Sequence, residues 1–126
     1  MPGPLIGVTI DCADLERSAQ FWSEALGFTD AGTDPDARFR TLFGPQRKAG
    51  LHHVTLQWVP ERKEGKNRLH LDLFFTDLDA EIERLFSLGA DIIRRDPIPE
   101  SEYRSVVMAD PDGNEFCVIE IPRISR

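Results

Sequence analysis

Residues Leu69–Ala90 read LHLDLFFTDLDAEIERLFSLGA, and the spacing of their apolar side chains changes halfway. From Leu69 to Phe74, leucines alternate with other residues, which is the period-two pattern of a strand with two different faces. Asp77 can then cap a helix, because its carboxylate can accept hydrogen bonds from free backbone N–H groups. The next apolar residues recur at helical spacing: Leu78, Ile82, Leu85 and Phe86. Gly89 suits the left-handed turn that ends many helices, so this stretch predicts a strand followed by a capped helix.

A near copy of this construction occurs half a chain length earlier. The stretch Leu5–Asp11 alternates as a strand, and Asp14 can cap the helix that follows. That helix has an apolar stripe formed by Leu15, Ala19, Trp22 and Leu26, and Gly27 ends it. Two copies of one unit indicate an internal duplication rather than a solenoid.

Short strands are expected after each helix, separated by turns rich in Gly, Pro and Asp. They lie at 28–29, 38–43 and 51–59 in the first half, and at 91–94, 103–109 and 115–121 in the second. Each half is therefore a βαβββ module: module 1 spans about 4–60, a charged linker spans 61–67, and module 2 spans about 68–122. Because neither module could cover its apolar sheet face alone, we expect a single domain over residues 1–126.

The composition excludes several classes of protein. The chain has 126 residues, with 15 Lys and Arg against 22 Asp and Glu, and a net charge of −7. An acidic protein repels phosphate backbones, so we expect no nucleic-acid partner. No apolar run approaches the ~20 residues that cross a bilayer, and the N-terminus lacks the pattern of a signal peptide, so we expect a cytoplasmic protein with no membrane partner. Cys12 and Cys117 have no metal-site spacing and are expected to be reduced thiols.

Several short motifs flank the predicted strands, helices and turns. They are DLERS at 14–18, LGF at 26–28, RLHLDL at 68–73 and DPDGN at 110–114. Together with the duplicated βαβββ unit, they make the chain resemble the vicinal oxygen chelate superfamily (glyoxalase I, bleomycin-resistance proteins and extradiol dioxygenases), in its glyoxalase-like domain subgroup. The resemblance implies an α+β fold, in which the two modules form curved mixed sheets around a cleft with the helices outside. It also implies a homodimer.

The strand faces turned away from the helices are expected to line the cleft and to bind a small organic molecule. The parity of the strands places the following residues there: Gly7, Thr9, Asp11, His53, Thr55, Gln57, His70, Asp72, Phe74, Glu115, Cys117 and Ile119. His70 and Asp72 are the candidate catalytic pair, since a histidine beside a carboxylate can act as a general base. The alternatives are that His70 is only a pocket histidine bonded to Asp72, and that Cys117 is a small buried apolar residue.

The resemblance also implies four positions that hold a divalent metal in relatives, which are Gly7, Gln57, His70 and Cys117 here. Glycine has no side chain, so the expected ligands reduce to His70 and Gln57, with Cys117 at the remaining position. This set differs from the oxygen and nitrogen ligands that suit Mg²⁺, Mn²⁺, Ni²⁺ or Fe²⁺. We therefore expect no tightly bound metal. A divalent ion (Zn, Ni, Mn or Fe) is the alternative, including a zinc site in which His53 or Asp72 joins His70 and Cys117.

Two functions follow from the resemblance. The first is a glyoxalase-like lyase or isomerase that acts on a carbonyl compound in the cleft. The second is a non-catalytic protein that binds a drug or metabolite without a metal, as bleomycin-resistance proteins do. The missing side chain at Gly7 agrees with the second function, whereas the His70–Asp72 pair agrees with the first.

Overall fold

The computed structural model describes residues 4–32, 37–45, 50–95 and 104–121. The chain divides into two compact units, Met1–Arg62 and Lys63–Arg126, which we call the first and second modules. The boundary between Arg62 and Lys63 falls inside the predicted linker, 61–67. The expectation that both modules form one domain stays a prediction.

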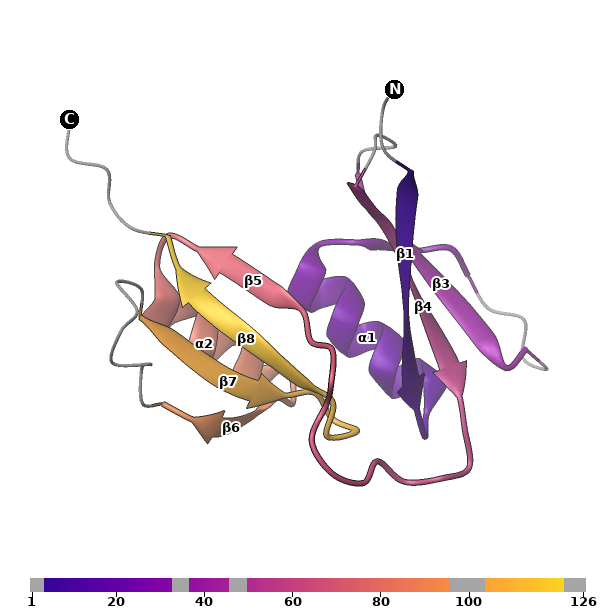
Figure 1. Cartoon of the computed structure of the whole chain (residues 1–126). Coiled ribbons are helices and arrows are strands. Elements are labelled where there is room, and N and C mark those ends of the chain that lie inside the picture. Colours follow the sequence, from indigo (N-terminus) through magenta and orange to yellow (C-terminus); the bar gives the residue numbers. More distant parts are fainter. Residues whose placement is uncertain (1–3, 33–36, 46–49, 96–103, 122–126) are drawn as a thin grey trace. The chain divides into compact units, whose positions relative to one another are not determined.

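Both modules have the same order of elements (Figure 1). The first contains β1 (Leu5–Cys12), α1 (Leu15–Leu26), β2 (Thr29–Asp30), β3 (Phe39–Phe43) and β4 (Gly50–Trp58). The second contains β5 (Asp72–Phe75), α2 (Leu78–Ser87), β6 (Asp91–Arg94), β7 (Ser105–Ala109) and β8 (Glu115–Glu120). The strand orders are β1-β4-β3-β2 and β5-β8-β7-β6, and in each sheet the first pair is parallel and the others are antiparallel. The α+β fold of two βαβββ modules is confirmed.

The predicted caps position both helices directly after the first strand of each module. The Asp14 carboxylate accepts a hydrogen bond from the Arg17 N–H at 3.1 Å, and the Asp77 carboxylate accepts one from the Ala80 N–H at 3.2 Å. Gly27 ends α1 in the left-handed conformation, with φ of 69°. In the part of the chain that the structure describes, neither helix has the length and apolar character needed to cross a membrane.

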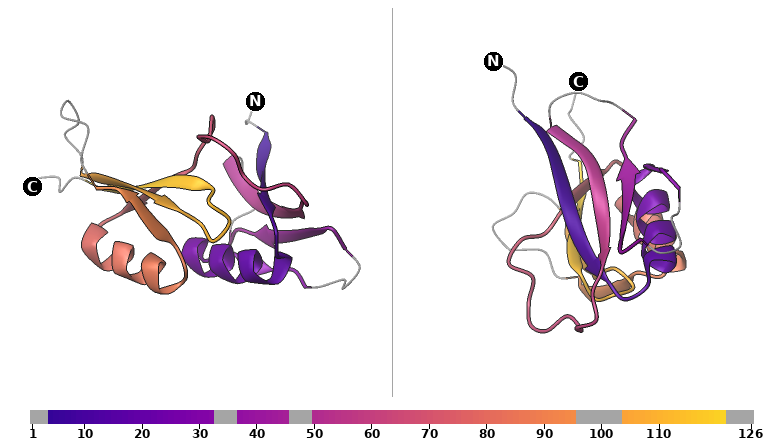
Figure 2. Two further views of the ribbon diagram at one scale, coloured as in Figure 1. Left: turned by 90° about the horizontal axis from the view of Figure 1, so that it is seen from below. Right: turned by 90° about the vertical axis from the view of Figure 1, so that its right-hand side faces the viewer.

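Each helix packs against one face of its own sheet, as the views in Figures 1 and 2 agree. The buried side chains lie between helix and sheet. They include Phe21, Trp22, Leu42, Val54 and Leu56 in the first module, and Leu78, Leu85, Met108, Phe116 and Val118 in the second. The opposite sheet face of each module is left free of its own helix, which is the face that the strand parity assigned to ligand binding.

Two apolar residues of the predicted strand–helix stretch, Leu69 and Phe86, are exposed, and so is Trp58. Leu69 is 83% exposed because β5 begins only at Asp72, where pairing with β8 starts. Phe86 is 59% exposed, although it directly follows the fully buried Leu85 in α2. Trp58 at the end of β4 is 37% exposed, and the Arg38 guanidinium lies 5.5 Å from its ring centroid.

The DPDGN motif forms the tight turn that leads into β8. The buried carboxylate of Asp110 accepts hydrogen bonds from the backbone N–H groups of Asp112 (2.9 Å) and Asn114 (2.8 Å) and from the Asn114 side-chain amide (3.0 Å). Gly113 has a φ of 88°, a conformation that favours glycine. These contacts fix where β8 starts and therefore which of its residues face the open side of the sheet.

Candidate functional site

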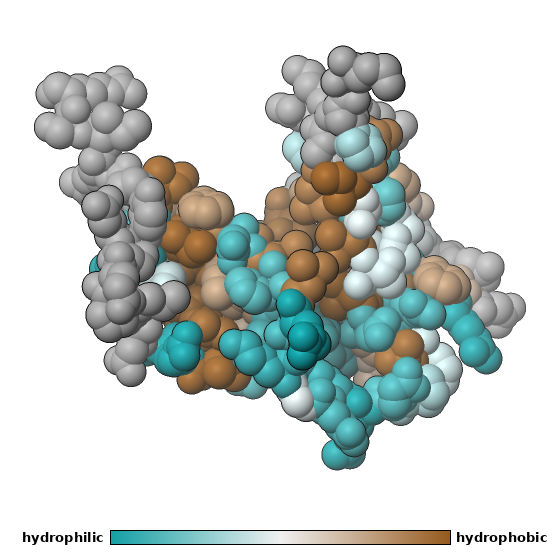
Figure 3. All heavy atoms as spheres, viewed as in Figure 1, coloured by the Kyte–Doolittle hydropathy of each residue, from teal (hydrophilic) through white to brown (hydrophobic). Residues whose placement is uncertain are grey.

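A pocket of about 440 Å³ lies on the second-module sheet, over the face turned away from α2. This face carries hydrophobic side chains next to hydrophilic ones (Figure 3). The apolar part of the wall comes from three strands and is formed by Phe74, Val107, Phe116 and Ile119. The polar part includes His70, Asp72 and Cys117, together with Lys66, Asn67, Arg94, Ser105 and Glu115. A mixed lining of this size suits a small organic molecule.

His70 and Asp72 lie close together in the lining of the pocket. The His70 Nδ1 atom is 3.2 Å from an Asp72 carboxylate oxygen, and the two side chains are 42% and 46% exposed. His70 precedes β5, whereas Asp72 is the first residue of that strand. When Nδ1–H donates to the carboxylate, the other ring nitrogen can accept a proton. The predicted pairing of these two residues is therefore present in the structure, and their catalytic role stays a prediction.

Cys117 lies beside this pair on the neighbouring strand. Parallel pairing of β5 with β8 sets Cys117 opposite Asp72, and the Cys117 N–H donates to the Leu71 carbonyl at 2.9 Å. Burial raises the pKa of the Cys117 thiol, and the negative charge of Asp72 raises it further, while Arg94 and Lys66 act in the opposite direction. One ligand atom each from His70, Asp72 and Cys117 can be chosen so that all lie within 4.8 Å of one another.

Arg94 reaches the pocket through an irregularity in β6. Ile92 pairs with Met108, but Arg94, not Ile93, pairs with Val107. The extra residue is a β-bulge, and it reverses the alternation of faces along the strand. Arg94 thus shares the open face with Val107. Strand parity could not identify Arg94, because a bulge leaves no clear mark in the sequence.

The segment predicted as a solvated linker is held against the second-module sheet. The Asn67 backbone N–H donates to the Glu115 carboxylate at 3.0 Å, and the Lys63 ammonium lies 3.7 Å from the same group. Lys66 and Asn67 consequently line the pocket. The Oδ1 atom of Asn67 is buried and has no hydrogen-bond partner among the residues that the structure describes. A bound molecule with an O–H or N–H group could satisfy this acceptor.

The other predicted site residues lie in the first module, on the corresponding sheet face. Thr9 pairs with Thr55, and the Thr55 hydroxyl is 3.2 Å from that of Thr41. Gly7 pairs with His53, and a β-carbon added at Gly7 would lie 2.1 Å from His53 Nε2. The imidazole of His53 therefore occupies the space that a side chain at residue 7 would need.

The two adjacent histidines of β4 lie at an irregularity of the strand. Neighbouring residues of a regular strand face opposite sides, so the predicted site included His53 alone of the two. The pairing of β1 with β4 shifts by one residue between Ile6 and Gly7, which leaves His52 as a bulge. The two Nδ1 atoms lie 3.0 Å apart, and both rings pack near Phe43.

The residues of the first module do not fit the metal site that the family resemblance implies. Gly7 has no ligand atom, and His53 fills its side-chain space. The internal repeat, which aligns Asp14 with Asp77, also aligns Thr9 with Asp72. Thr9 pairs with Thr55 on the neighbouring strand, and Asp72 pairs with Cys117, so the counterpart of Cys117 in the first module is Thr55 and not Gln57. Gln57 pairs with Asp11 and belongs to the other module from His70. Coordination of a divalent metal by His70 and Gln57 stays a prediction, and the alignment of the two modules does not support Gln57 as the second ligand.

A family model described as "Glyoxalase-like domain" matches residues 7–119. Curated relatives include "Glyoxalase 1" of Caenorhabditis elegans, 25% identical over 91% of this chain, and "Glyoxalase domain-containing protein 4" of Rattus norvegicus, 23% identical over 92%. The match covers 42% and 40% of those proteins, so the chain spans less than half the length of these relatives.

Solved structures share the fold at low sequence identity. The fosfomycin resistance protein FosX from Listeria monocytogenes superposes with a TM-score of 0.73 at 18% identity, covering 97% of this chain and 96% of that one. A superfamily member from Sphaerobacter thermophilus gives a TM-score of 0.67 at 24% identity, covering 94% and 98%. A Listeria FosX variant of the same fold is described as complexed with Mn(II) and 1S,2S-dihydroxypropylphosphonic acid, with a TM-score of 0.72 at 18% identity, covering 94% and 90%.

Proposed function

Since the chain belongs to the glyoxalase-like domain family, we propose that it binds a small anionic carbonyl compound in the second-module pocket and acts on it as a lyase or isomerase. The observation that carries this proposal is the pocket lining. It combines an apolar wall, two cationic side chains (Lys66 and Arg94) and the His70–Asp72 pair in one cavity of about 440 Å³. The homodimer that the resemblance implies remains part of the proposal.

Each part of the lining has a role toward such a ligand. Lys66 and Arg94 attract a carboxylate or phosphonate group, and Arg94 can bind it with two parallel hydrogen bonds. The apolar wall receives the carbon skeleton. The free ring nitrogen of His70 takes a proton from the carbon next to the carbonyl group, while Asp72 holds the imidazole and stabilises its charged form. The proton returns to another atom of the same molecule in an isomerase, or leaves with an eliminated group in a lyase.

The test begins with binding. Thermal unfolding is measured with a panel of small carboxylates and phosphonates, each beside its uncharged amide or ester. A ligand at about 100 times its Kd stabilises the folded protein by about 2.7 kcal/mol. Arg94→Gln should weaken anion binding about tenfold or more, which is the loss expected for one charge-assisted hydrogen bond. Arg95→Gln is the matched control, because Arg95 does not line this pocket.

The best-binding anion is then assayed for turnover. Asp72→Asn should keep binding and lose most of the activity, because the amide no longer stabilises a charged imidazole. Stabilisation of the protein by uncharged analogues alone would refute the anionic ligand. Tight anion binding without any turnover would favour the second candidate, a non-catalytic drug- or metabolite-binding protein, which the absence of a ligand side chain at Gly7 supports.

A further inference from the structure

We infer that Phe74 forms a subsite for a large apolar substituent of the bound carbonyl compound, about the size of a phenyl ring or larger. The inference rests on the proposed function, because it names the class of carbonyl compound that the same pocket takes. Phe74 lies in β5 and lines the pocket, yet it is 57% exposed. An aromatic ring with this exposure in a pocket wall offers apolar surface that a ligand can cover.

Strand register arranges the pocket lining in rows across the sheet. Residues two apart on a strand share a face, so successive rows on the open face lie about 6.6 Å apart. Pairing across β5, β8 and β7 defines two such rows. The Asp72 row is Asp72, Cys117 and Val107, and the Phe74 row is Phe74, Ile119 and Ser105.

The cationic side chains of the lining lie away from the Phe74 row. Arg94 pairs with Val107 and so extends the Asp72 row onto β6. Lys66 is held near the start of β8, because the backbone N–H of the next residue, Asn67, donates to Glu115. The Phe74 row lies on the other side of the Asp72 row, and its lining side chains that the structure describes are apolar apart from Ser105. The pocket therefore changes from charged to apolar along β5 and β8.

This order of rows sets the orientation of the ligand. When the anionic group binds Lys66 or Arg94 and the reacting carbon lies at the His70–Asp72 pair, the remaining substituent extends toward Phe74. The pocket volume of about 440 Å³ is in the range that accepts drug-sized molecules, which exceeds what the smallest carbonyl acids fill. Burial of an apolar group as large as a phenylalanine side chain strengthens binding about 10- to 100-fold.

The test compares two 2-oxo acids, in which the substituent on the carbonyl carbon is methyl or benzyl, by isothermal titration calorimetry of the full chain. The wild type should bind the benzyl acid at least about tenfold more tightly than the methyl acid. Phe74→Ala should remove most of this preference and hardly change the Kd of the methyl acid. Phe74→Leu should restore part of the preference, since leucine also offers apolar surface. Phe39→Ala is the matched control, because Phe39 is 55% exposed but lies in β3 of the first module.

The amides of both acids separate this inference from the proposed function. Two results would overturn the Phe74 subsite while the anionic ligand stands: acids that bind the wild type without preference for benzyl, or a preference that persists in folded Phe74→Ala. A benzyl amide that binds as tightly as the benzyl acid, and loses affinity in Phe74→Ala, would support the subsite and refute the anionic ligand. Failure of both acids and both amides to bind the folded wild type would refute the two proposals together.

Discussion

At the scale of single residues, the most informative contact is the one between Gly7 and His53. A β-carbon at residue 7 would lie 2.1 Å from His53 Nε2 and 2.5 Å from His53 Cε1, both far shorter than van der Waals contact. The backbone at Gly7 is ordinary extended strand, so glycine is needed there for space and not for conformation. The absence of a side chain at residue 7 and the position of the His53 ring are therefore two aspects of one packing arrangement.

This arrangement predicts that Gly7→Ala lowers the free energy of unfolding by about 1–3 kcal/mol, the usual range for overpacking. The cost should largely disappear in the background of His53→Ala, because the ring that meets the new methyl group is gone. Denaturant unfolding of the wild type, both single variants and the double variant measures this coupling. An equal destabilisation by Gly7→Ala with and without His53 would contradict the contact.

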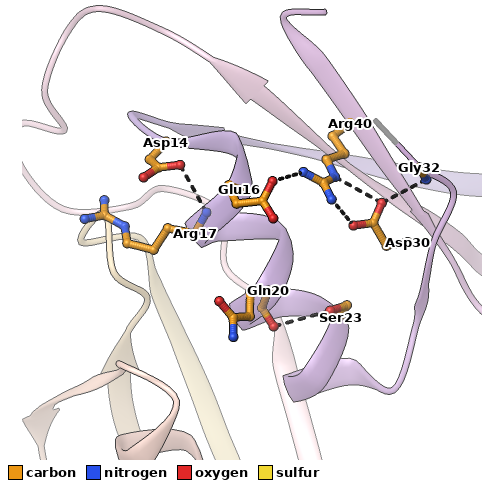
Figure 4. A network of polar contacts seen from close by, with 8 residues as sticks. All are labelled: Asp14, Glu16, Arg17, Gln20, Ser23, Asp30, Gly32 and Arg40. Carbon is orange, nitrogen blue, oxygen red and sulfur yellow. Dashed lines mark hydrogen bonds and ion pairs between the residues drawn. The ribbon is translucent and has the colours of Figure 1, made fainter. Parts of the chain in front are cut away.

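At the scale of elements, a partly buried arginine joins the helix and two strands of the first module (Figure 4). Arg40 of β3 donates from Nε and Nη2 to the two carboxylate oxygens of Asp30 in β2, and from Nη1 to Glu16 of α1 at 2.8 Å. The Arg40 and Asp30 side chains are 12% and 27% exposed, whereas Glu16 is 78% exposed. The Arg40–Asp30 pair should therefore carry most of the stabilisation.

Asp30→Asn is expected to lower the free energy of unfolding by about 1.5 kcal/mol at neutral pH, as for the loss of a charged hydrogen-bond partner. The hydrogen bond from Arg40 holds the pKa of Asp30 below its ordinary value of 3.8. The carboxylate thus stabilises the fold fully above that value, and this stabilisation is lost as the pH falls through the lower pKa of the folded state. The free energies of unfolding of the wild type and of Asp30→Asn should therefore converge below about pH 4, which denaturation measured at several pH values can show.

Glu16→Gln is the control for this prediction. Its ion pair with Arg40 is exposed, and such pairs contribute between 0 and about 1 kcal/mol. Two results would contradict the dominant role of the Arg40–Asp30 pair. One is a larger destabilisation by Glu16→Gln than by Asp30→Asn, and the other is a difference in unfolding free energy between wild type and Asp30→Asn that increases as the pH falls.

The helices and strands also show which features could be predicted from the sequence and which could not. Regular elements followed their patterns: both helices, their aspartate caps and the alternation in β8 that turns Cys117 to the open face were predictable. The failures occur where backbone pairing departs from regularity. The bulge at Ile93 gives Arg94 the register position opposite Val107, and the bulge at His52 shifts the pairing of β4 with β1. β5 begins at Asp72 and not at Leu69. Such departures depend on contacts between distant segments, which leave no local period.

At the scale of the whole molecule, the two modules repeat one topology but differ in chemistry. The open face of the second module has a pocket with a histidine, a carboxylate and a thiol close together. The corresponding face of the first module has paired threonines and a histidine packed over a glycine. Both modules share the helix–sheet packing that stabilises them, whereas the side chains on the open faces differ between the modules.

The last prediction concerns whether the two modules unfold together. Each has one helix on one sheet face and about 60 residues, a size at which a separate core is marginal. We therefore predict one cooperative transition. Both tryptophans, Trp22 and Trp58, lie in the first module, so their fluorescence reports on that module alone. Leu85→Ala, at a fully buried position of α2, should destabilise the second module by about 2–5 kcal/mol and should lower the tryptophan transition midpoint accordingly.

Phe86→Ala, at the next position of the same helix, is the matched control. Phe86 is 59% exposed, so its truncation should change the midpoint of the tryptophan transition very little. Independent modules would give a different pattern: Leu85→Ala would leave tryptophan fluorescence unchanged while the far-ultraviolet circular dichroism signal split into two steps. Coincident transitions by both probes, shifted together by Leu85→Ala, would mean that stability is shared across the module boundary and that residues 1–126 behave as one domain.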